Sequence, residues 1–386
     1  MADPYLGTRT QLSFGEETTP GTKASTSVTQ FGLVNSADLP DEEIDWLKFW
    51  NIGSGRDYNQ AVEGKHILAS SLPVTIQSGL PLFYAFGKET CVGTAVGGGG
   101  ASTLNGALAV GDTTVNVVSA TGYSVNDYIQ IDVTTSAEVR KITAIVTNAL
   151  TIDKGVRLAH LTGVACGEVI APYTHKLSLG NSLKSFTLEG AQLADTNFVR
   201  HFDGCYMGTM DIGCAEESAL ETTLGLKAMK TEASGTSAST VTPSGTVPFM
   251  FNNGVITQHG GALTRTTSFK LNMDNKIKEK HYIQSSNARY PYEYIIGRRV
   301  IDISVTAVAD AKTWWDFLKT PGAATTFSAK FSRSATDYID IQATDVRLKS
   351  GPHKFPEEGE ISVDLSYIAQ TCSAEVMDAI PYYWAI

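Results

Sequence analysis

The sequence of 386 residues has little charge, because Asp, Glu, Lys and Arg together make up only 18% of it. This fraction is below that of typical globular proteins and excludes a long acidic or basic disordered chain. No apolar run approaches the roughly 18 residues of a membrane span, which excludes an integral helical membrane protein. Residues 1–7 have neither a basic nor an apolar segment, so we expect no secretory signal.

Positive charge is also scarce: 30 Lys and Arg face 40 Asp and Glu, and the formal net charge is -10. A protein that grips nucleic acid by neutralising phosphates needs the opposite balance. This class of protein is therefore disfavoured. An acidic protein that stands close to nucleic acid and repels it remains compatible with the composition.

Cysteines are few and lack metal-binding spacing. There are five, an odd number, and no C-x-x-C occurs, which argues against a zinc ribbon or a thioredoxin-type motif. Cys205 and Cys214 lie in one alternating run; on a single strand they would be roughly 30 Å apart. A disulfide needs Cα atoms within about 7 Å. We expect all five cysteines to be buried small apolar residues.

Catalytic motifs are missing as well. There is no H-E-x-x-H and no G-x-S-x-G, and the seven histidines are scattered without ligand spacing. The carboxylate pairs are adjacent in sequence, as in Glu16-Glu17 and Glu42-Glu43, and on a strand such neighbours point to opposite faces. The sequence therefore predicts no catalytic residue, cofactor or metal site, and a protein that is not an enzyme.

Period-two alternation of apolar and polar residues is the dominant positive signal. It recurs at 186–189, 269–274, 301–307, 339–342 and 361–367. This pattern is typical of antiparallel strands with one packed and one wet face. Helix signals are fewer. We expect one helix after Asp310 over 311–318, one over 41–50 after Pro40, and a short one around Leu80–Phe86.

Two breaks divide the chain. Gly97–Gly100 predicts a flexible linker, and residues 233–240 form a second polar, small-residue stretch. Between the glycine run and about Ala171, short strands with turn signals predict a small β-barrel or sandwich inserted into a host fold that resumes at Pro172. The expected divisions are 1–97, 98–171 for the insert, 172–370, and a C-terminal arm at 371–386.

Several segments, in their order along the chain, resemble bacteriophage tail tube proteins. The opening segment is Leu12–Thr22, and the later ones are Tyr173–Gly180, Ser185–Glu189, Phe202–Cys205, Phe269–Asn275 and Gly297–Val300. The resemblance covers most of 1–97 and 172–370. The insert and the residues from 371 onward depart from the simplest members.

The resemblance implies a mainly β fold of two packed antiparallel sheets with a flanking helix, here with an inserted small all-β domain. It implies a structural virion protein whose hexameric rings stack into a tube. Viral DNA passes through the lumen without specific binding. Other tail proteins, namely the tape measure, the terminator and the tail tip, are the implied partners. The implied location is the virion tail, assembled in the host cytoplasm.

Two sets of residues are candidates for this role. The acidic positions on wet strand faces are candidates to line the lumen: Glu189, Asp211, Asp302, Asp340 and Asp364. The apolar C-terminus is a candidate to dock on an adjacent subunit, because a short tail with large apolar groups does not easily bury itself; its residues are Met377, Ile380, Tyr382, Tyr383, Trp384 and Ile386. The alternative is that this tail folds back on its own sheet.

Other functions remain open from the sequence alone. Another virion β protein, such as a tail terminator or a capsid decoration protein, would share the composition. A bacterial surface protein or adhesin would also be acidic and β-rich, although it would usually carry a signal sequence. A glycoside-active enzyme could hide two carboxylates in a β fold. If the chain is a tube subunit, an insert on the outside would collide with a sheath, which favours a long non-contractile tail.

Overall fold

The structure is a computed structural model that describes residues 10–25, 27, 29–52, 55–193, 197–234, 241–258, 261–263, 265–283, 289–308, 325–354 and 360–383. Strands dominate these residues, which confirms the mainly β prediction. The predicted short helix is present as α1 (Leu80–Phe86). The helix predicted over 311–318 falls outside the described residues.

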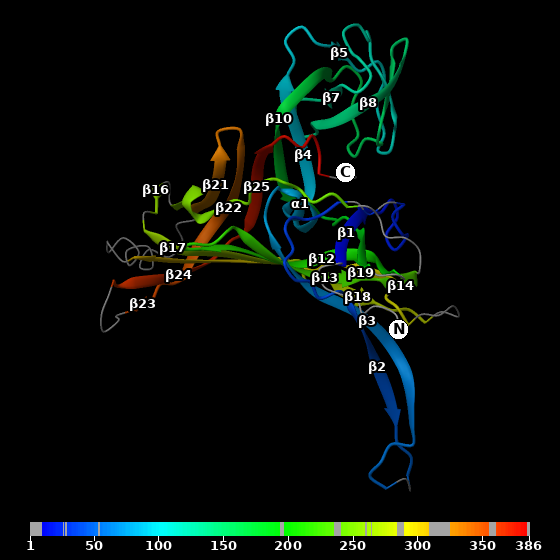
Figure 1. The fold of residues 1–386 in the computed structure, drawn as a ribbon, viewed down its shortest axis with the longest axis vertical. Helices are drawn as coiled ribbons and strands as arrows, with labels where there is room; N and C mark the ends of the chain where they lie inside the picture. The colour runs from blue at the N-terminus through cyan, green and yellow to red at the C-terminus, as the bar shows by residue number, and fades with distance from the viewer. Residues whose placement is uncertain are drawn as a thin grey trace.

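Sheet I is a long antiparallel sheet (Figure 1). Its strands, in spatial order, are β2 (Asp41–Phe49), β3 (Gln60–Thr75), β13 (Glu221–Ala228), β12 (Phe198–Ala215), β17 (Thr266–Asp274), β20 (Val300–Val308) and β24 (Ser362–Ile368). Along β20 and β24 buried residues alternate with more exposed ones. The alternation predicted at 301–307 is therefore confirmed, and that predicted at 361–367 is confirmed from Ser362 onward, whereas Ile361 is exposed.

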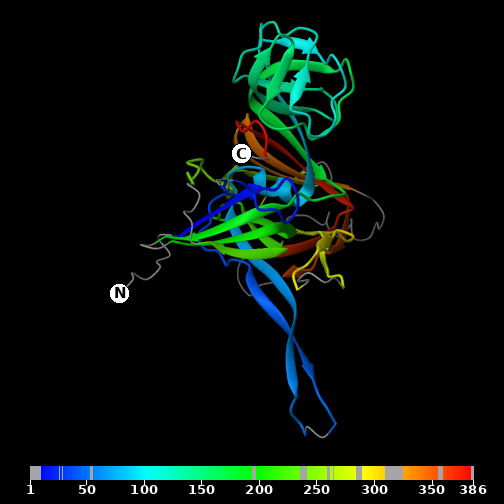
Figure 2. The same ribbon diagram turned by 90° about the vertical axis from the view of Figure 1, so that its right-hand side faces the viewer.

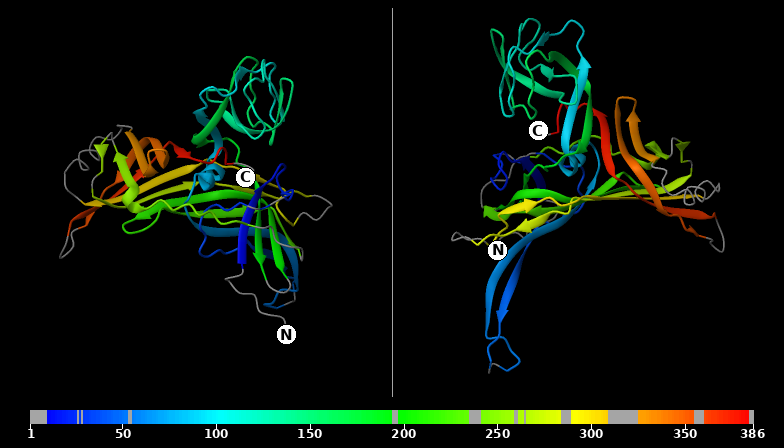
Figure 3. Two further views of the ribbon diagram at one scale, coloured as in Figure 1. Left: turned by 45° about the horizontal axis from the view of Figure 1, so that its top comes forward. Right: turned by 180° about the vertical axis from the view of Figure 1, so that it is seen from behind.

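Sheet II packs beside sheet I and is also antiparallel. Its order is β4 (Gly87–Ala95), β10 (Ala165–Leu179), β25 (Thr371–Asp378), β22 (Asp337–Ser350), β21 (Thr325–Ser334), β15 (Gly254–Gln258) and β16 (Gly261–Ala262). Strand β22 bends at Asp345, whose φ is 50°, and its last residues pair with β24 of sheet I. In Figure 3 the orange and red strands β21, β22 and β25 rise from the strands of sheet I.

A smaller third sheet shares the first half of β12. It adds β1 (Thr10–Glu16), β11 (Phe186–Gln192) and β14 (Lys230–Ser234). The remaining short elements are β18 (Lys278–Lys280), β19 (Glu293–Ile295), β23 (His353–Lys354) and a 3-10 turn at Phe251–Asn253. Cys205 and Cys214 both lie on β12, as expected. All five cysteines are free thiols, four of them buried and Cys214 half-buried.

One hydrophobic core lies between sheets I and II. It takes Ile212 and Ile303 from sheet I, Leu177 and Ile341 from sheet II, and the whole of α1. Helix α1 is so short because Gly87 ends it in the left-handed conformation, at φ 87°. Both sheets bury their apolar faces in this one core, which confirms the prediction of two packed sheets.

Residues 101–166, named the lobe here, surround a second hydrophobic cluster. Strands β5 (Ala101–Thr103), β6 (Thr114–Asn116), β7 (Tyr128–Ile131), β8 (Glu138–Val146) and β9 (Ala149–Ile152) lie in it. It stands at one end of the molecule (Figures 1 and 2). Strand β10 runs from the lobe into sheet II across the predicted boundary at 171, with an irregularity in its pairing to β4 between Ile170 and Thr174.

The expectation of a flexible linker at Gly97–Gly100 is wrong. The N–H of Gly99 donates to the carbonyl of Val96 at 3.2 Å, and the N–H of Gly100 donates to the Glu168 carboxylate at 3.0 Å. A Cβ on Gly100 would lie only 2.4 Å from the Tyr123 ring. Close packing requires glycine at Gly100, whereas a Cβ on Gly97 or Gly98 would meet nothing within 4 Å. The run forms a turn held by these hydrogen bonds.

The predicted helix over 41–50 is also wrong, because this segment forms strand β2. Its aromatic residues have low helix propensity and high strand propensity, and β3 offers a partner in register from Asp41↔Ala69 to Phe49↔Gln60. The hairpin projects from the body at the end opposite the lobe (Figures 1 and 2). The acidic start that suggested a helix cap lies on an extended chain instead.

Candidate functional site

The polar face of sheet I gathers three of the five predicted lumen-lining acids. Directly opposed residues of antiparallel strands share a face. The register places Asp211 opposite Asn272, Asn272 opposite Asp302, and Thr306 opposite Asp364. The residues between them along each strand are buried in the core. Asp211, Asp302 and Asp364 therefore lie on the same half-exposed surface.

This polar face carries both signs of charge, with acids in excess. By register its acids are Asp41, Glu43, Asp211, Glu221, Asp274, Asp302 and Asp364, and its bases are Lys65, Lys227, Lys270, Arg347 and Lys349. Asp211 lies 3.6 Å from the Lys270 ammonium and also accepts a hydrogen bond from Asn272. Thr306 donates to Asp364 at 2.9 Å.

A hollow of about 400 Å³ opens on the same face. Asp211, Lys270, Asn272, Asp302, Ser304, Lys349 and Ser366 are among its lining residues. Two of these side chains are acids and two are lysines, so the hollow is nearly neutral. It offers no grouping of carboxylates that would hold a metal; among the described residues no cluster of three His, Cys, Asp or Glu does so.

Glu189 does not lie on a wet face, contrary to the prediction. Strand β11 is buried on both sides, and Glu189 is 4% exposed and 3.6 Å from the His201 ring. The segment after β1 covers the polar side of this strand: Glu17 accepts a hydrogen bond from Thr187, and the N–H of Ala24 donates to the same hydroxyl. Strand alternation cannot reveal such a cover.

Asp340 lies on a different surface from the other acids. It is in the part of β22 that belongs to sheet II, opposite Lys330 and Glu375, and it accepts hydrogen bonds from Ser328 and Gln342. Both sheets turn their apolar faces to one core. Asp340 therefore lies on the polar face of sheet II, a different face from the one that carries Asp211, Asp302 and Asp364.

The hairpin formed by β2 and β3 exposes an unusual set of large apolar side chains. We use "the hairpin" for residues 45–63, where β3 has left β13 and pairs only with β2. Its exposed apolar residues are Trp46, Leu47, Phe49, Trp50, Ile52, Tyr58 and Val62. Trp46, Phe49 and Trp50 are 51–63% exposed. Apolar exposure on this scale marks an interaction surface, which the helix interpretation of this segment hid.

The root of the hairpin is fixed by polar contacts. The His66 ring lies 2.5 Å from Glu42 and 3.0 Å from Glu63, and Tyr290 donates to Glu42 at 2.6 Å. This hydrogen bond from Tyr290 lowers the pKa of Glu42. These contacts therefore hold the base of the hairpin, while the apolar side chains of its outer part stay exposed.

The candidate docking tail is packed within its own chain. Met377 lies on β25, which pairs with β10 on one side and β22 on the other. Tyr382 and Tyr383 are 8% and 1% exposed, and Ile380 packs against the main core. The expectation of an exposed C-terminal arm is wrong for residues 371–383, because partner strands within the chain bury it. Trp384 and Ile386 lie outside the described residues.

A buried cluster that the sequence did not suggest lies around His175 on β10. Its Nδ1 is 2.7 Å from Glu89 and its Nε2 is 2.7 Å from the carbonyl of Ile380, with Asp378 at 3.4 Å. Both ring nitrogens face acceptors, so both donate and the ring is an imidazolium. Burial opposes this charge, but Cys91, Asp378 and Glu89 raise the pKa of His175 well above its usual value.

This cluster contains a thiol, an imidazole and a carboxylate, the groups of a nucleophilic site. Burial raises the pKa of the Cys91 thiol, which makes it a poor nucleophile. The hollow beside it has a volume of about 10 Å³, room for a single water at most. The arrangement can stabilise the packing of the chain, and it leaves no space for a substrate.

No helix in the part of the chain that the structure describes has the length and apolar character to cross a membrane. Comparison with protein families finds one model, described as phage tail tube protein, that matches residues 7–369. Comparison with curated proteins gives no match. The family match spans the hairpin, sheet I, the lobe and all strands of sheet II except β25.

Proposed function

The chain belongs to the phage tail tube protein family, and from this premise we propose that it is the subunit of a tube of stacked, hexameric rings that guides viral DNA into the host. The family is structural, which agrees with an arrangement of buried rather than accessible reactive groups. The protein is a component of the virion tail that assembles with itself and with other tail proteins. We further propose assembly in the host cytoplasm, with the tape measure, the terminator and the tail tip as those partners.

The hairpin is the observation that carries this proposal. A two-stranded hairpin with bare aromatic side chains is marginal in water, and it gains most by packing on another subunit. Strand β2 also ends sheet I, since its only strand partner among the described residues is β3. Closing the sheets of neighbouring subunits into a ring removes such open edges.

The polar face of sheet I is the proposed channel wall. Acids outnumber bases on it, so it does not attract the DNA backbone as a basic groove would. Sheet II and the lobe then lie on the outer side of the wall, because they join the opposite face of sheet I. The inserted domain at 98–171 would then lie on the outside of every subunit. A domain in this position would collide with a sheath, which supports a long non-contractile tail.

Negative-stain electron microscopy of the purified protein tests the proposal. We expect stacked-ring tubes to form spontaneously as the protein concentration rises, with protein and no other tail component present. A capsid decoration protein or an adhesin would stay as single particles or small rings. If the protein stayed monomeric at every concentration and salt condition tested, the proposal of a tube subunit would be rejected.

Reversing the charge of the channel wall should slow DNA delivery. Asp302→Lys together with Asp364→Lys places new cations where phosphates pass, and each phosphate contact steepens the salt dependence of DNA binding by about 0.9 in log–log slope. We expect assembled tubes to retain DNA at low salt and to release it at high salt. The measurement is the rate of DNA ejection as a function of salt.

Asp340→Lys is the matched control, because it makes the same change on the opposite sheet. It should leave both the ejection rate and its salt dependence unchanged. If the Asp340 variant slows ejection and the double variant does not, sheet II and not sheet I faces the channel.

A further inference from the structure

The lobe and the body meet through charged side chains that are buried. On the lobe side, Glu138 on β8 is 4% exposed. It accepts hydrogen bonds from the His160 ring at 2.6 Å and from the N–H of Arg157 at 3.0 Å, and it pairs with Arg140. Burial alone would raise the pKa of Glu138. The hydrogen bond from His160 and the charge of Arg140 have the larger effect, so the pKa of Glu138 is lowered. Glu138 thereby fixes the 157–160 segment.

Arg157 then reaches from the lobe into the body. Its guanidinium donates to the Glu16 carboxylate of β1 at 2.7 Å and lies 4.7 Å from the centre of the Phe83 ring on α1. Both partners of the ion pair are mostly buried, with 14% of each side chain exposed. Breaking one side of such a pair is costly, because the other charge stays buried.

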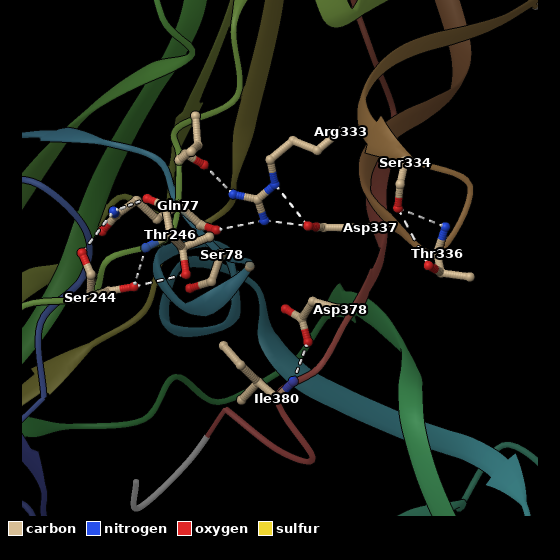
Figure 4. Close-up of polar contacts among 12 residues, drawn as sticks. Gln77, Ser78, Ser244, Thr246, Arg333, Ser334, Thr336, Asp337, Asp378 and Ile380 are labelled. Carbon is tan, nitrogen blue, oxygen red and sulfur yellow. Dashed lines mark hydrogen bonds and ion pairs between the residues drawn. The ribbon is translucent and has the colours of Figure 1, made fainter.

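The segment 378–383, which we call the strap, begins at the last residue of β25. Its first turn is closed by Asp378, which accepts the N–H of Ile380 at 2.8 Å, as Figure 4 shows beside α1. Tyr383 belongs to the body: it stacks on His175 with 4.1 Å between ring centres, and its hydroxyl donates to Asp378 at 2.6 Å. The strap is thus anchored to the body.

Tyr382, the neighbour of Tyr383, faces the other way and contacts the lobe. Its hydroxyl donates to Asp153, and the Arg140 guanidinium lies 5.7 Å from the centre of its ring. The N–H of Cys91 on β4 adds a backbone bond to the carbonyl of Ala137 at 2.9 Å. Two consecutive tyrosines therefore hold the two parts of the molecule from one short segment.

We propose that the strap and Arg157 together lock the lobe at a fixed angle to the body, so that the lobe is a rigid extension of sheet II. The lobe contacts the strap through its buried polar side chains, and this contact lies within one chain. This inference concerns one subunit and stands whether or not the subunits form a tube.

Amide hydrogen exchange on the soluble subunit tests the lock. Arg157→Gln with Tyr382→Phe removes the ion pair and one hydroxyl, and leaves the cores untouched. We expect exchange in 87–96 and 165–171 to rise about ten-fold or more, because these strands join the lobe to the body and now open locally. Exchange in 149–152 of the lobe core, which pairs with β6 and β8, and in 301–305 of sheet I should not change.

The matched control is Arg333→Gln with Tyr338→Phe. Arg333 has the same side-chain exposure as Arg157 and pairs with Asp337 at 2.7 Å (Figure 4), and the Tyr338 hydroxyl donates to Glu375 at 2.6 Å. Both control residues lie away from the lobe. The control should leave exchange at the joint unchanged.

The single variant Tyr382→Phe removes one oxygen only, so it should fold even if the double variant does not. It should also raise exchange at the joint. Three results would overturn the lock: no change at the joint in either test variant, an equal rise throughout the molecule, or the same rise at the joint in the control.

Discussion

Replacing Trp46, Phe49 and Trp50 by serine is expected to leave a folded subunit that no longer forms tubes. These side chains are about half-exposed in the subunit, so the fold loses little when they are removed. Burying the rest of each on a neighbouring subunit contributes roughly 1 kcal/mol or more. Their combined loss should raise the critical concentration for assembly roughly a hundred-fold or more.

Sedimentation of polymer and circular dichroism of the soluble fraction measure this effect together. The polymer fraction should fall to background at concentrations where the unmodified protein is fully assembled, while the β-sheet spectrum stays the same. The matched control is Val118→Ser, Val146→Ser and Leu161→Ser, which removes exposed apolar groups from the lobe. Normal tubes from the hairpin variant would show that the hairpin is not an assembly contact.

Replacing His175 by glutamine should cause the largest loss of stability. The substitution removes the buried cation and leaves Glu89 and Asp378 in place around a neutral group. Breaking a buried ion pair by removing one partner costs about 3–5 kcal/mol. Urea unfolding of the soluble subunit should show this as a lower midpoint. Lys176→Gln, on the next and exposed position of β10, should have little effect.

The same group predicts how stability depends on pH. The pKa of His175 is raised in the folded state, so its contribution is complete below about pH 6.5, the value of a free imidazole. It is lost as the pH rises through the higher folded-state pKa. The unmodified protein should therefore lose stability over that range, and the glutamine variant should lack this part of the slope.

A double variant separates lost charge balance from lost packing. Glu89→Gln added to His175→Gln removes an uncompensated carboxylate, so it should recover part of the stability. If the single variant His175→Gln had the same unfolding midpoint and the same pH profile as the unmodified protein, His175 would not carry the charge.

Sequence alternation predicted much of sheet I because these strands are packed on one face only. It failed at β11, where residues 17–24 cover the second face and bury Glu189. The helix predicted at 41–50 was wrong because its acidic start suits a helix N-terminus, although its aromatic residues favour a strand. Pairing with β3 makes this segment a strand, and a local sequence window does not reveal that partner.

The candidate site was predictable only in part for the same reason. Strand alternation marked Asp302 and Asp340 alike as wet, but strand pairing assigns them to opposite sheets. The C-terminal residues look like an exposed tail because their partners are distant: β25 pairs with β10, about two hundred positions earlier. The buried cluster of His175, Glu89 and Asp378 left no motif, since its members come from three separate strands.

The lobe is inserted at a point where the chain leaves and returns at the same place. Thr103 on β5 lies opposite Ala165 on β10, so the two ends of the insertion are cross-strand neighbours. Recombination could exchange one lobe for another of any length without changing the spacing of the body. A foreign lobe would still need an arginine for Glu16 and an acceptor for Tyr382. Those two requirements give a design rule for displaying a chosen domain on this scaffold.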